Sequence, residues 1–443
     1  MSYRLQIIDL FGRTNINKWY SFLQKSQYWS ISEQEAYQNE KLQQLVKHAF
    51  EQVPYYKKLF KELHLSPADI RCKEDLQKLP VIRRSDLQQN YLALMAGNHE
   101  SYHSQYRSTG GTTGIPTKYL SDMNSWSLHW ALKYRGWEWS TYNIGDKVAI
   151  FGGASLIPDE KTSLSRKIWN QINQFYPMPS THLSENDLEG HASVIKQHNI
   201  KCLRGYPSSI AMFANFCREN NIVINIDSVI TTAEVLLPNY KAGIVSAFNP
   251  VIIDSYGCAD AGGNANTCIH DKGFHVSVES AVWEVCNANG FPVDLNEKGE
   301  VTLTSLSNYA MPLLRYQPGD VIINNFDESV CSCGCTLPRI KNIVGRTTDV
   351  IRFSNGRSLS GPALTVLFSK FSLNKYQVIQ NSENSVDINL IPGTQFDQKQ
   401  YNRILELMKH HCGAGIEIFI YKVDNIPTPY SGKHRFIINN TLK

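Results

Sequence analysis

The alternation of short apolar runs with amphipathic helical segments between residues 145 and 257 constrains the fold of this chain most strongly. We expect strands at 147–151, 201–204, 228–232 and 251–254, and helices at 184–198, 210–219 and 240–248. Such alternation predicts a mostly parallel sheet flanked by helices, because parallel neighbours are joined by helical crossovers. Ligands of these sheets bind at the carboxyl ends of the strands, where we expect turns at 152–153, 205–207 and 255–257.

The rest of the chain predicts further structural units. We expect helices over 1–65 with a break at Pro54, and an aromatic helix over 126–139. Residues 273–340 are rich in strand and turn signals, which predicts a smaller β subdomain. The prediction is an α/β protein whose large N-terminal domain (1–344) has mostly parallel sheets. A hinge at 345–349 and a small mobile α+β lid domain at 350–443 follow.

The composition excludes several classes of protein. Hydrophobic residues make up 42% and charged residues 19%, which is typical of a globular chain. A net charge of +4 over 443 residues, without any Lys/Arg-rich run, argues against nucleic acid as a partner. Charge appears too early for a signal peptide, and no apolar run is long enough for a membrane span. We expect a cytoplasmic protein that binds a small molecule. The sequence is compatible with a homodimer and does not establish the oligomeric state.

A loop rich in glycine and threonine occupies residues 108–114. It consists of Ser108, Thr109, Gly110, Gly111, Thr112, Thr113 and Gly114. Glycine permits a positive φ that turns backbone N–H groups inward, and the hydroxyls add donors without adding charge. Such a loop suits an anionic polyphosphate, although it lacks the Gly-Lys-Ser/Thr end of a Walker A motif. Taken alone, a loop of this kind is more often an ordinary turn.

Five stretches together resemble the motifs of the adenylate-forming enzymes, the acyl-CoA synthetase and luciferase superfamily. They are the loop 108–114, Ser-Tyr-Gly-Cys-Ala-Asp at 255–260, Arg-Tyr-Gln-Pro-Gly-Asp at 315–320, Gly-Arg-Thr-Thr-Asp at 345–349 and Pro-Tyr-Ser-Gly-Lys-His-Arg at 429–435. The resemblance covers about residues 40–440 and is greatest to phenylacetate–CoA ligases and their capsule-polysaccharide relatives. Val-Pro-Tyr-Tyr at 53–56 and Cys-Ser-Cys-Gly at 331–334 support that branch.

The resemblance implies a role for each matching residue. The glycine loop would hold the β,γ-phosphates of ATP, and Asp260 would bind Mg²⁺ with the loop threonine Thr109. Lys433 would reach from the second domain to the α-phosphate and the carboxylate oxygen, as a catalytic residue. Nucleotide contacts are further implied for Ala233, Glu234, Ser255, Tyr256, Gly257, Asp320 and Arg346. Activation of this kind needs positioning and charge stabilisation rather than a covalent nucleophile.

Three positions depart from the pattern of the family. Asp260 stands where the family usually has Glu, so the carboxylate reaches less far toward a metal. Gln317 replaces the Arg that usually precedes the ribose-binding Asp, which removes or moves a local ion pair. Thr348 stands at the usual hinge position, where Asp or Lys is common, and Asp349 follows it.

Four Cys and His residues form a candidate metal site. Cys331 and Cys333 are spaced for one metal, and Cys268 and His275 lie about sixty residues upstream. Such a Cys₃His set would suit structural Zn²⁺, and relatives of this branch carry similar residues. Cys335 and Cys258 are the rival ligands, and a turn with free thiols is the alternative.

The function expected from the resemblance is ATP-dependent activation of a carboxylic acid to an acyl-adenylate, followed by acyl transfer to coenzyme A. An alternative acceptor is an amine or hydroxyl during capsule or O-antigen polysaccharide synthesis. A second alternative is a nucleotide-binding module without catalysis. The acyl pocket is expected to include Tyr134, Phe151, Gly152, Tyr206 and Pro207. Aromatic walls suit aryl, aliphatic and amino-acid carboxylates alike, so these residues do not identify the acid.

Overall fold

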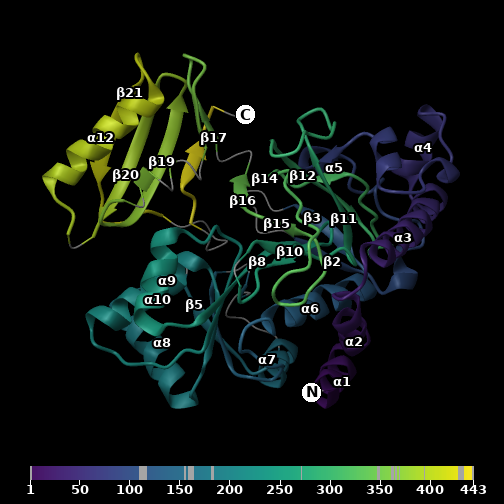
Figure 1. The fold of residues 1–443 in the computed structure, drawn as a ribbon, viewed down its shortest axis with the longest axis horizontal. Helices are drawn as coiled ribbons and strands as arrows, with labels where there is room; N and C mark the ends of the chain where they lie inside the picture. Colours follow the sequence, from purple (N-terminus) through teal and green to yellow (C-terminus); the bar gives the residue numbers. More distant parts are fainter. Residues whose placement is uncertain are drawn as a thin grey trace.

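The computed structural model has the mixed α/β fold that the sequence predicts, with helix-flanked sheets and a separate C-terminal domain (Figure 1). It describes residues 2–108, 117–153, 156–157, 164–180, 184–270, 272–346, 350–360, 364, 367–368, 370–393, 395–427 and 434–441. Among the helices so described, none combines the length and the apolar character needed to cross a bilayer.

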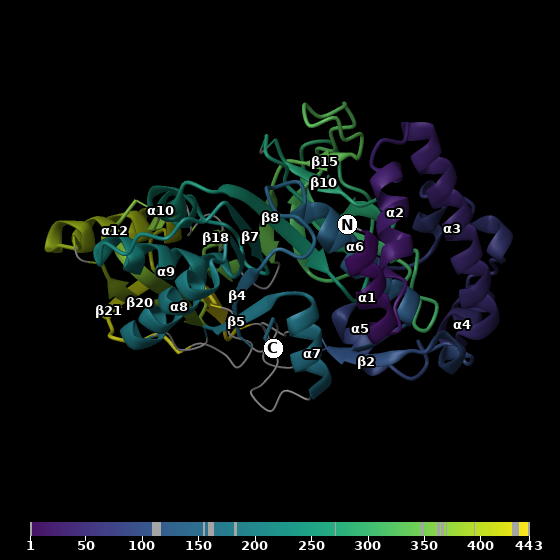
Figure 2. The same cartoon turned by 90° about the horizontal axis from the view of Figure 1, so that it is seen from below.

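The N-terminal region is helical, and its helices form one end of the molecule (Figure 2). Its elements are α1 (Ser2–Gly12), α2 (Ile16–Ser26), α3 (Ile31–Gln52), α4 (Pro54–Glu62), η1 (Pro67–Asp69), η2 (Glu74–Lys78), α5 (Arg84–Gln89) and η3 (His99–Tyr102). A capping box starts α3, in which Ser30 and Glu33 satisfy each other's backbone N–H groups. The predicted break at Pro54 is confirmed, since Pro54 is the first residue of α4.

An eight-stranded sheet carries the strand–helix alternation. Its order is β15-β10-β9-β8-β7-β6-β4-β5, and the neighbours from β8 to β5 are parallel. The strands are β4 (Val148–Gly152), β5 (Phe175–Pro179), β6 (Cys202–Gly205), β7 (Ser228–Thr232), β8 (Val251–Cys258), β9 (Gly263–Asn266), β10 (Phe274–Val276) and β15 (Arg339–Ile340). The helices are α6 (Met123–Trp137), α7 (Leu164–Ile172), α8 (Glu185–His198), α9 (Pro207–Glu219) and α10 (Pro238–Phe248).

Two hydrophobic cores lie on opposite faces of this sheet, because successive side chains of a strand alternate. On β4, Val148 and Ile150 join the core that contains α6, whereas Ala149 and Phe151 join the core that contains α8 and α9. The predicted turn at 255–257 is wrong. β8 continues through these residues because Ser255–Cys258 pair with β9 in antiparallel register.

The strands of the predicted β subdomain divide between two sheets. β10 and β15 extend the eight-stranded sheet through β9, while β11 to β14 form a six-stranded sheet with β1 and β16. That second sheet contains β1 (Ile82–Arg83), β11 (Ala281–Cys286), β12 (Lys298–Ser305), β13 (Tyr316–Gln317), β14 (Asp320–Ile323) and β16 (Ile343–Arg346). A separate hairpin consists of β2 (Gln105–Ser108) and β3 (Lys118–Ser121).

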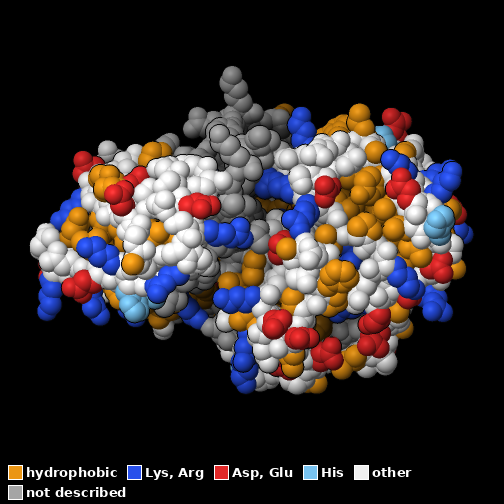
Figure 3. All heavy atoms as spheres, turned by 90° about the horizontal axis from the view of Figure 1, so that it is seen from above, with side chains coloured by type: hydrophobic (Ala, Val, Ile, Leu, Met, Phe, Trp, Pro, Cys, Tyr) orange, Lys and Arg blue, Asp and Glu red, His pale blue; other side chains and the backbone are white. Residues whose placement is uncertain are grey.

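The C-terminal domain has its own core around Val378, Ile388 and Ile404. A four-stranded sheet of order β21-β20-β19-β22 packs against α12, beside the small β17–β18 hairpin. The elements are β17 (Val350–Arg352), β18 (Ser358–Ser360), β19 (Leu373–Ser382), β20 (Ser385–Pro392), α12 (Gln398–Cys412), β21 (Glu417–Lys422) and β22 (Ile437–Asn439). This domain lies beside α9 and α10 (Figure 1). Lys and Arg side chains lie on both sides of the junction between the C-terminal domain and the rest of the molecule (Figure 3).

Candidate functional site

The carboxyl ends of β7 and β8 bring together several of the residues expected at the nucleotide, namely Ala233, Glu234, Ser255, Tyr256 and Gly257. Ala233 follows β7 with a φ of 69°, a left-handed conformation that costs energy in a residue with a side chain. Ser255 donates a 2.6 Å hydrogen bond to Asn266 Oδ1 across the β8–β9 pair. Tyr256 packs against Trp283, with ring centroids 5.6 Å apart. These contacts position the end of β8 firmly.

Asp320 lies next to this strand end, although it comes more than sixty residues later in the sequence. The Tyr256 hydroxyl donates to Asp320 Oδ2 at 2.7 Å, and Asp320 is only 7% exposed. Arg346 is its register partner in the β14–β16 ladder. Gln317 points elsewhere, since its Nε2 donates to Thr302 Oγ1 at 3.1 Å. The arrangement therefore pairs Asp320 with Tyr256 rather than with position 317.

Asp260 lies in the turn between β8 and β9 and is 5% exposed. The Cys258 thiol donates to its Oδ1 at 3.0 Å. Burial, and then the charge of Asp260, raises the pKa of Tyr316 above its usual value. A single carboxylate in such a position suits Mg²⁺, which commonly takes one or two protein carboxylates together with substrate phosphates. Asp260 thus has the ligand chemistry that Mg²⁺ prefers, and Thr109, the other expected ligand, lies outside the described residues.

The glycine loop is closed by the β2–β3 hairpin, in which Ser108 pairs with Lys118. Thr117, at the end of the loop, is fully buried and accepts hydrogen bonds from Arg84 Nε and Gln88 Nε2. Both flanks of the loop are therefore anchored. The predicted phosphate-binding residues Thr109, Gly110, Gly111, Thr112, Thr113 and Gly114 lie outside the described residues.

Glu234 connects the two domains. Its Oε2 accepts a 2.6 Å hydrogen bond from the Ser208 hydroxyl at the start of α9, and its Oε1 accepts the backbone N–H of His434 at 2.9 Å. His434 is buried, and its Nε2 lies 2.8 Å from the carbonyl oxygen of Tyr376. Lys433 lies outside the described residues. Its neighbour His434 is bonded to Glu234, which follows the carboxyl end of β7.

The residues predicted for the acyl pocket fall on two faces of the sheet. Tyr134 is buried in the α6 core, where its hydroxyl bonds Asn173. Phe151 packs in the opposite core, with its ring 5.0 Å from that of Phe213. Between them, β4 and β6 approach so closely that a Cβ on Gly205 would lie 1.9 Å from the Phe151 carbonyl oxygen. Gly152 ends β4, Tyr206 is fully buried and Pro207 starts α9.

Cys268, His275, Cys331 and Cys333 converge, with their ligand atoms all within 4.8 Å of one another. Cys268 Sγ lies 3.8 Å from Cys331 Sγ, and Cys333 Sγ lies 3.6 Å from His275 Nε2. Zn–S bonds of about 2.3 Å in a tetrahedron place sulfur atoms about 3.8 Å apart. The cluster therefore has the spacing of a closed four-ligand zinc site, and it can hold a metal.

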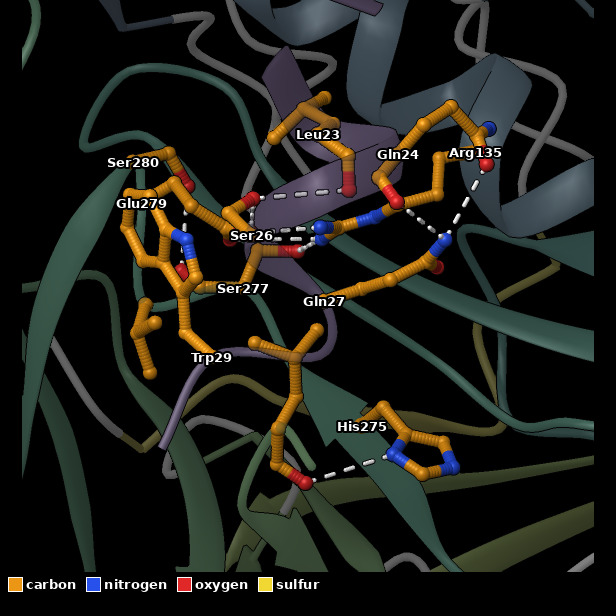
Figure 4. Close-up of polar contacts among 12 residues, drawn as sticks. Leu23, Gln24, Ser26, Gln27, Trp29, Arg135, His275, Ser277, Glu279 and Ser280 are labelled. Atoms are coloured by element: carbon orange, nitrogen blue, oxygen red, sulfur yellow. Dashed lines mark hydrogen bonds and ion pairs between the residues drawn. The ribbon is translucent and has the colours of Figure 1, made fainter. Parts of the chain in front are cut away.

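The surroundings of this cluster orient its ligands. His275 Nδ1 faces the carbonyl oxygen of Leu337 at 3.4 Å, which leaves Nε2 for the thiols (Figure 4). Burial lowers the pKa of His275 to about 4, which keeps the imidazole neutral. Figure 4 also shows the nearby buried pair Arg135 and Glu279, whose Nη1 and Oε1 are 2.6 Å apart. Ser26 of α2 donates to the same Glu279 oxygen. This network anchors α2 and α6 beside the cluster.

Sequence reasoning missed the link between Glu234 and His434, and it treated Arg204 only as the end of a strand. The sequence does contain a pattern that predicts burial of Arg204. Strand alternation assigns it to the same face as Cys202, which is a buried core residue. A charged residue at such a position needs either a partner or a ligand.

Three comparisons with known proteins agree on one class. The family model of the CapK C-terminal domain matches residues 353–440. A phenylacetate-coenzyme A ligase of Thermus thermophilus is 24% identical over 377 residues, covering 80% of this chain and 79% of the relative. Protein CapK of Staphylococcus aureus is 21% identical over 418 residues, covering 91% and 88%.

The structural comparison identifies the fold as that of an adenylate-forming ligase. A crystal structure of 2-hydroxyisobutyryl-CoA ligase in the postadenylation state, in complex with R3-HIB-AMP, superposes with a TM-score of 0.72. It is 16% identical, and the match covers 93% of this chain and 91% of the ligase. The resemblance to phenylacetate–CoA ligases and CapK that the motifs indicated is therefore confirmed.

Proposed function

We propose that this chain is an ATP-dependent ligase that converts a carboxylic acid to an acyl-adenylate and then transfers the acyl group to coenzyme A. The phenylacetate-coenzyme A ligase relatives and the acyl-CoA ligase fold support this class of reaction. The observation that carries the proposal is the meeting of Tyr256, Asp320 and Asp260 at one end of β8, with His434 of the C-terminal domain bonded beside them to Glu234.

In this proposal the N-terminal domain binds ATP and the lid domain completes the site. Asp320 accepts from the ribose hydroxyls, while Ser255 and Tyr256 border the adenine. Asp260 and Thr109 hold Mg²⁺, which supplies positive charge to the phosphates. Lys433 places an ammonium at the α-phosphate oxygen that gains charge as the carboxylate attacks and pyrophosphate leaves. Groups directed at developing charge stabilise the transition state more than the ground state.

The domains would rotate about residues 345–349, because the face that Lys433 closes for adenylation must open to admit a thiol. β16 ends at Arg346 in the six-stranded sheet, and β17 starts at Val350 in the C-terminal domain. Only three residues thus connect two separately packed units. The metal at Cys268, His275, Cys331 and Cys333 would be a structural Zn²⁺, since the set is closed by four protein ligands.

The CapK relative supports one alternative, in which the acyl group is delivered to an amine or hydroxyl acceptor of a polysaccharide pathway. The adenylation half-reaction is then the same, and only the acceptor differs. A panel of carboxylic acids distinguishes the outcomes: pyrophosphate release with an acid supports ligase activity, and its dependence on coenzyme A separates the two acceptors. No release with any acid would favour a nucleotide-binding module.

Lys433→Ala tests the mechanism itself. Removal of one donor aimed at developing charge costs about 3–4 kcal/mol, or roughly 10²–10³ in rate. The variant is expected to lose that factor in pyrophosphate release while ATP binding stays close to wild type. Given a presynthesised acyl-adenylate, it should still transfer the acyl group to coenzyme A. Adenylation at a wild-type rate would refute the role of Lys433.

A further inference from the structure

Five basic side chains gather on the α6 side of the eight-stranded sheet. They are Arg107 of β2, His129 and Lys133 of α6, Arg166 of α7 and Arg204 of β6. Their charges act on one another. Burial, followed by the charges of Arg204, Arg107 and Arg166, lowers the pKa of Lys133 well below its usual value. Burial, followed by Lys133, Arg107 and Arg204, lowers the pKa of His129 in the same way. We call these five residues the basic cluster.

The tryptophans of α6 form the floor of the basic cluster. The Arg107 guanidinium carbon lies 3.3 Å from the ring centroid of Trp126, and Lys133 Nζ lies 4.4 Å from that of Trp130. The guanidinium carbon of Arg204 lies 5.0 Å from the Trp137 ring. Aromatic faces attract cations, so these rings orient the basic groups. They supply no negative charge.

The basic cluster has no acidic partner among the residues that the structure describes. None of its five side chains forms an ion pair there, and Arg204, at 6% exposure, has a buried Nε without a hydrogen-bond partner. Arg135, on the same helix α6, is paired with Glu279. The buried Arg315 is paired with Glu284 at 3.1 Å. A buried cation without a partner is costly, so Arg204 favours an anion that the described residues do not supply.

The position of the basic cluster indicates which anion this is. Arg204 pairs in register with Ile150 of β4 and Ile230 of β7, one residue before the carboxyl end of β6 at Gly205. It therefore stands among the strands assigned to the acyl pocket. Arg107 is the residue before Ser108, at the start of the loop assigned to the phosphates. The adenine and ribose contacts belong instead to β7, β8 and β14.

We propose that the basic cluster binds a second anionic group on the carboxylic acid substrate. The acid would then be a dianion, either a dicarboxylate or a carboxylate that also carries a phosphate. One carboxylate would be adenylated at the end of β8, while Arg204 and Lys133 hold the other charge. This inference rests on the proposed function and narrows its substrate class.

Matched pairs of acids test it by acid-dependent exchange of pyrophosphate into ATP. Succinate is compared with butyrate, and 3-phosphoglycerate with glycerate, so that each pair differs in the second anion. The preference is the ratio of kcat/KM for the dianion to kcat/KM for its partner. In Arg204→Met and in Lys133→Met, this preference should fall about 100-fold, because a site built for a charge strongly rejects its absence. Lys167→Met removes an exposed lysine of α7 and should leave the preference unchanged. If the variants lose only the preference for succinate over butyrate, the second group is a carboxylate. If they lose only the preference for 3-phosphoglycerate over glycerate, it is a phosphate.

Thermal melting separates this inference from the proposed function. Without ligand, Arg204→Met should melt at or above wild type, since an apolar replacement removes an unpaired buried charge. Succinate or 3-phosphoglycerate should raise the melting temperature of wild type and not of Arg204→Met. If no acid supports exchange but a dianion stabilises only the wild type, the proposed function fails and the anion site stands. Equal preference for both members of each pair in wild type, or no stabilisation by either dianion, overturns the inference.

Discussion

The contact between Glu234 and His434 predicts a selective effect on one half-reaction. Glu234→Ala removes the acceptor for the His434 N–H at 2.9 Å, the hydrogen bond that holds the segment after Lys433 against the N-terminal domain. A hydrogen bond to a charged group contributes about 1.5–3 kcal/mol. That is roughly a 10–150-fold change in the equilibrium for the closed arrangement of the domains. Adenylation, for which the proposed function places Lys433 at the α-phosphate, should slow by that factor.

Two further variants make the prediction quantitative. Ser208→Ala removes the hydroxyl that donates to Glu234 within the N-terminal domain and keeps the bond from His434 to Glu234, so adenylation should slow much less. Glu234→Gln keeps one oxygen that can accept the His434 N–H without the charge, and it should fall between the other two variants.

The assay measures the two half-reactions separately. Pyrophosphate formation reports adenylation, and coenzyme A added to a presynthesised acyl-adenylate reports transfer. ATP affinity is measured in parallel, because Glu234 is also assigned to the adenine border. The reasoning is wrong if both half-reactions slow equally, or if Ser208→Ala is as slow as Glu234→Ala at unchanged ATP affinity.

The remaining predictions concern the metal and pH. The purified protein should contain about one zinc per chain; Cys331→Ser should lower both zinc content and melting temperature, whereas Cys412→Ser, a buried cysteine away from the cluster, should retain the zinc. Metal-free wild type with unchanged melting would contradict this. Burial lowers the pKa of His434 to about 4, so the unfolded chain takes up the proton first as pH falls. The free energy of unfolding should therefore drop by up to roughly 3 kcal/mol between about pH 6.5 and 4. Urea titrations at several pH values should show this drop in the free energy of unfolding for wild type and not for His434→Gln. If the free energies of the two proteins change in parallel with pH, His434 is not responsible.

The sequence predicted those parts of the fold that depend on local pattern. The parallel strands β4, β6, β7 and β8 and the helices α8, α9 and α10 follow from alternation and period, and they lie within a few residues of the predicted ranges. The helix α7 and the parallel strand β5 were not predicted. The division of residues 273–340 between two sheets was missed, because strand pairing depends on partners distant in the sequence. β10 pairs with β9 and β15, whereas β11 pairs with β12. No local signal distinguishes β10 from β11 in this respect.

The candidate site was predicted residue by residue through resemblance, and the structure adds the contacts among those residues. Cys268 and His275 were matched to Cys331 and Cys333 from residue type and spacing, and all four converge. The hydrogen bond from Tyr256 to Asp320 joins two motifs that the sequence separates. The basic cluster was missed because its members come from four elements that the sequence does not place together, although strand alternation assigns one of them, Arg204, to a buried face.

The two sides of the candidate site differ in the contacts that hold them in place. The strands that would hold the nucleotide are braced from behind: β9 pairs with β8, β10 pairs with β9, and the Arg135–Glu279 pair beside the Cys/His cluster secures α6 and α2. The C-terminal domain, in contrast, meets the N-terminal domain at the hydrogen bond from the His434 N–H to Glu234, and Leu237 and Tyr240 of α10 line a cavity together with Phe368 and Tyr376 of the C-terminal domain. That hydrogen bond contributes about 1.5–3 kcal/mol, which is less than the cost of exposing a large buried apolar core to water. An enzyme that must open between two half-reactions needs this combination, in which a rigid binding surface faces a partner that can leave.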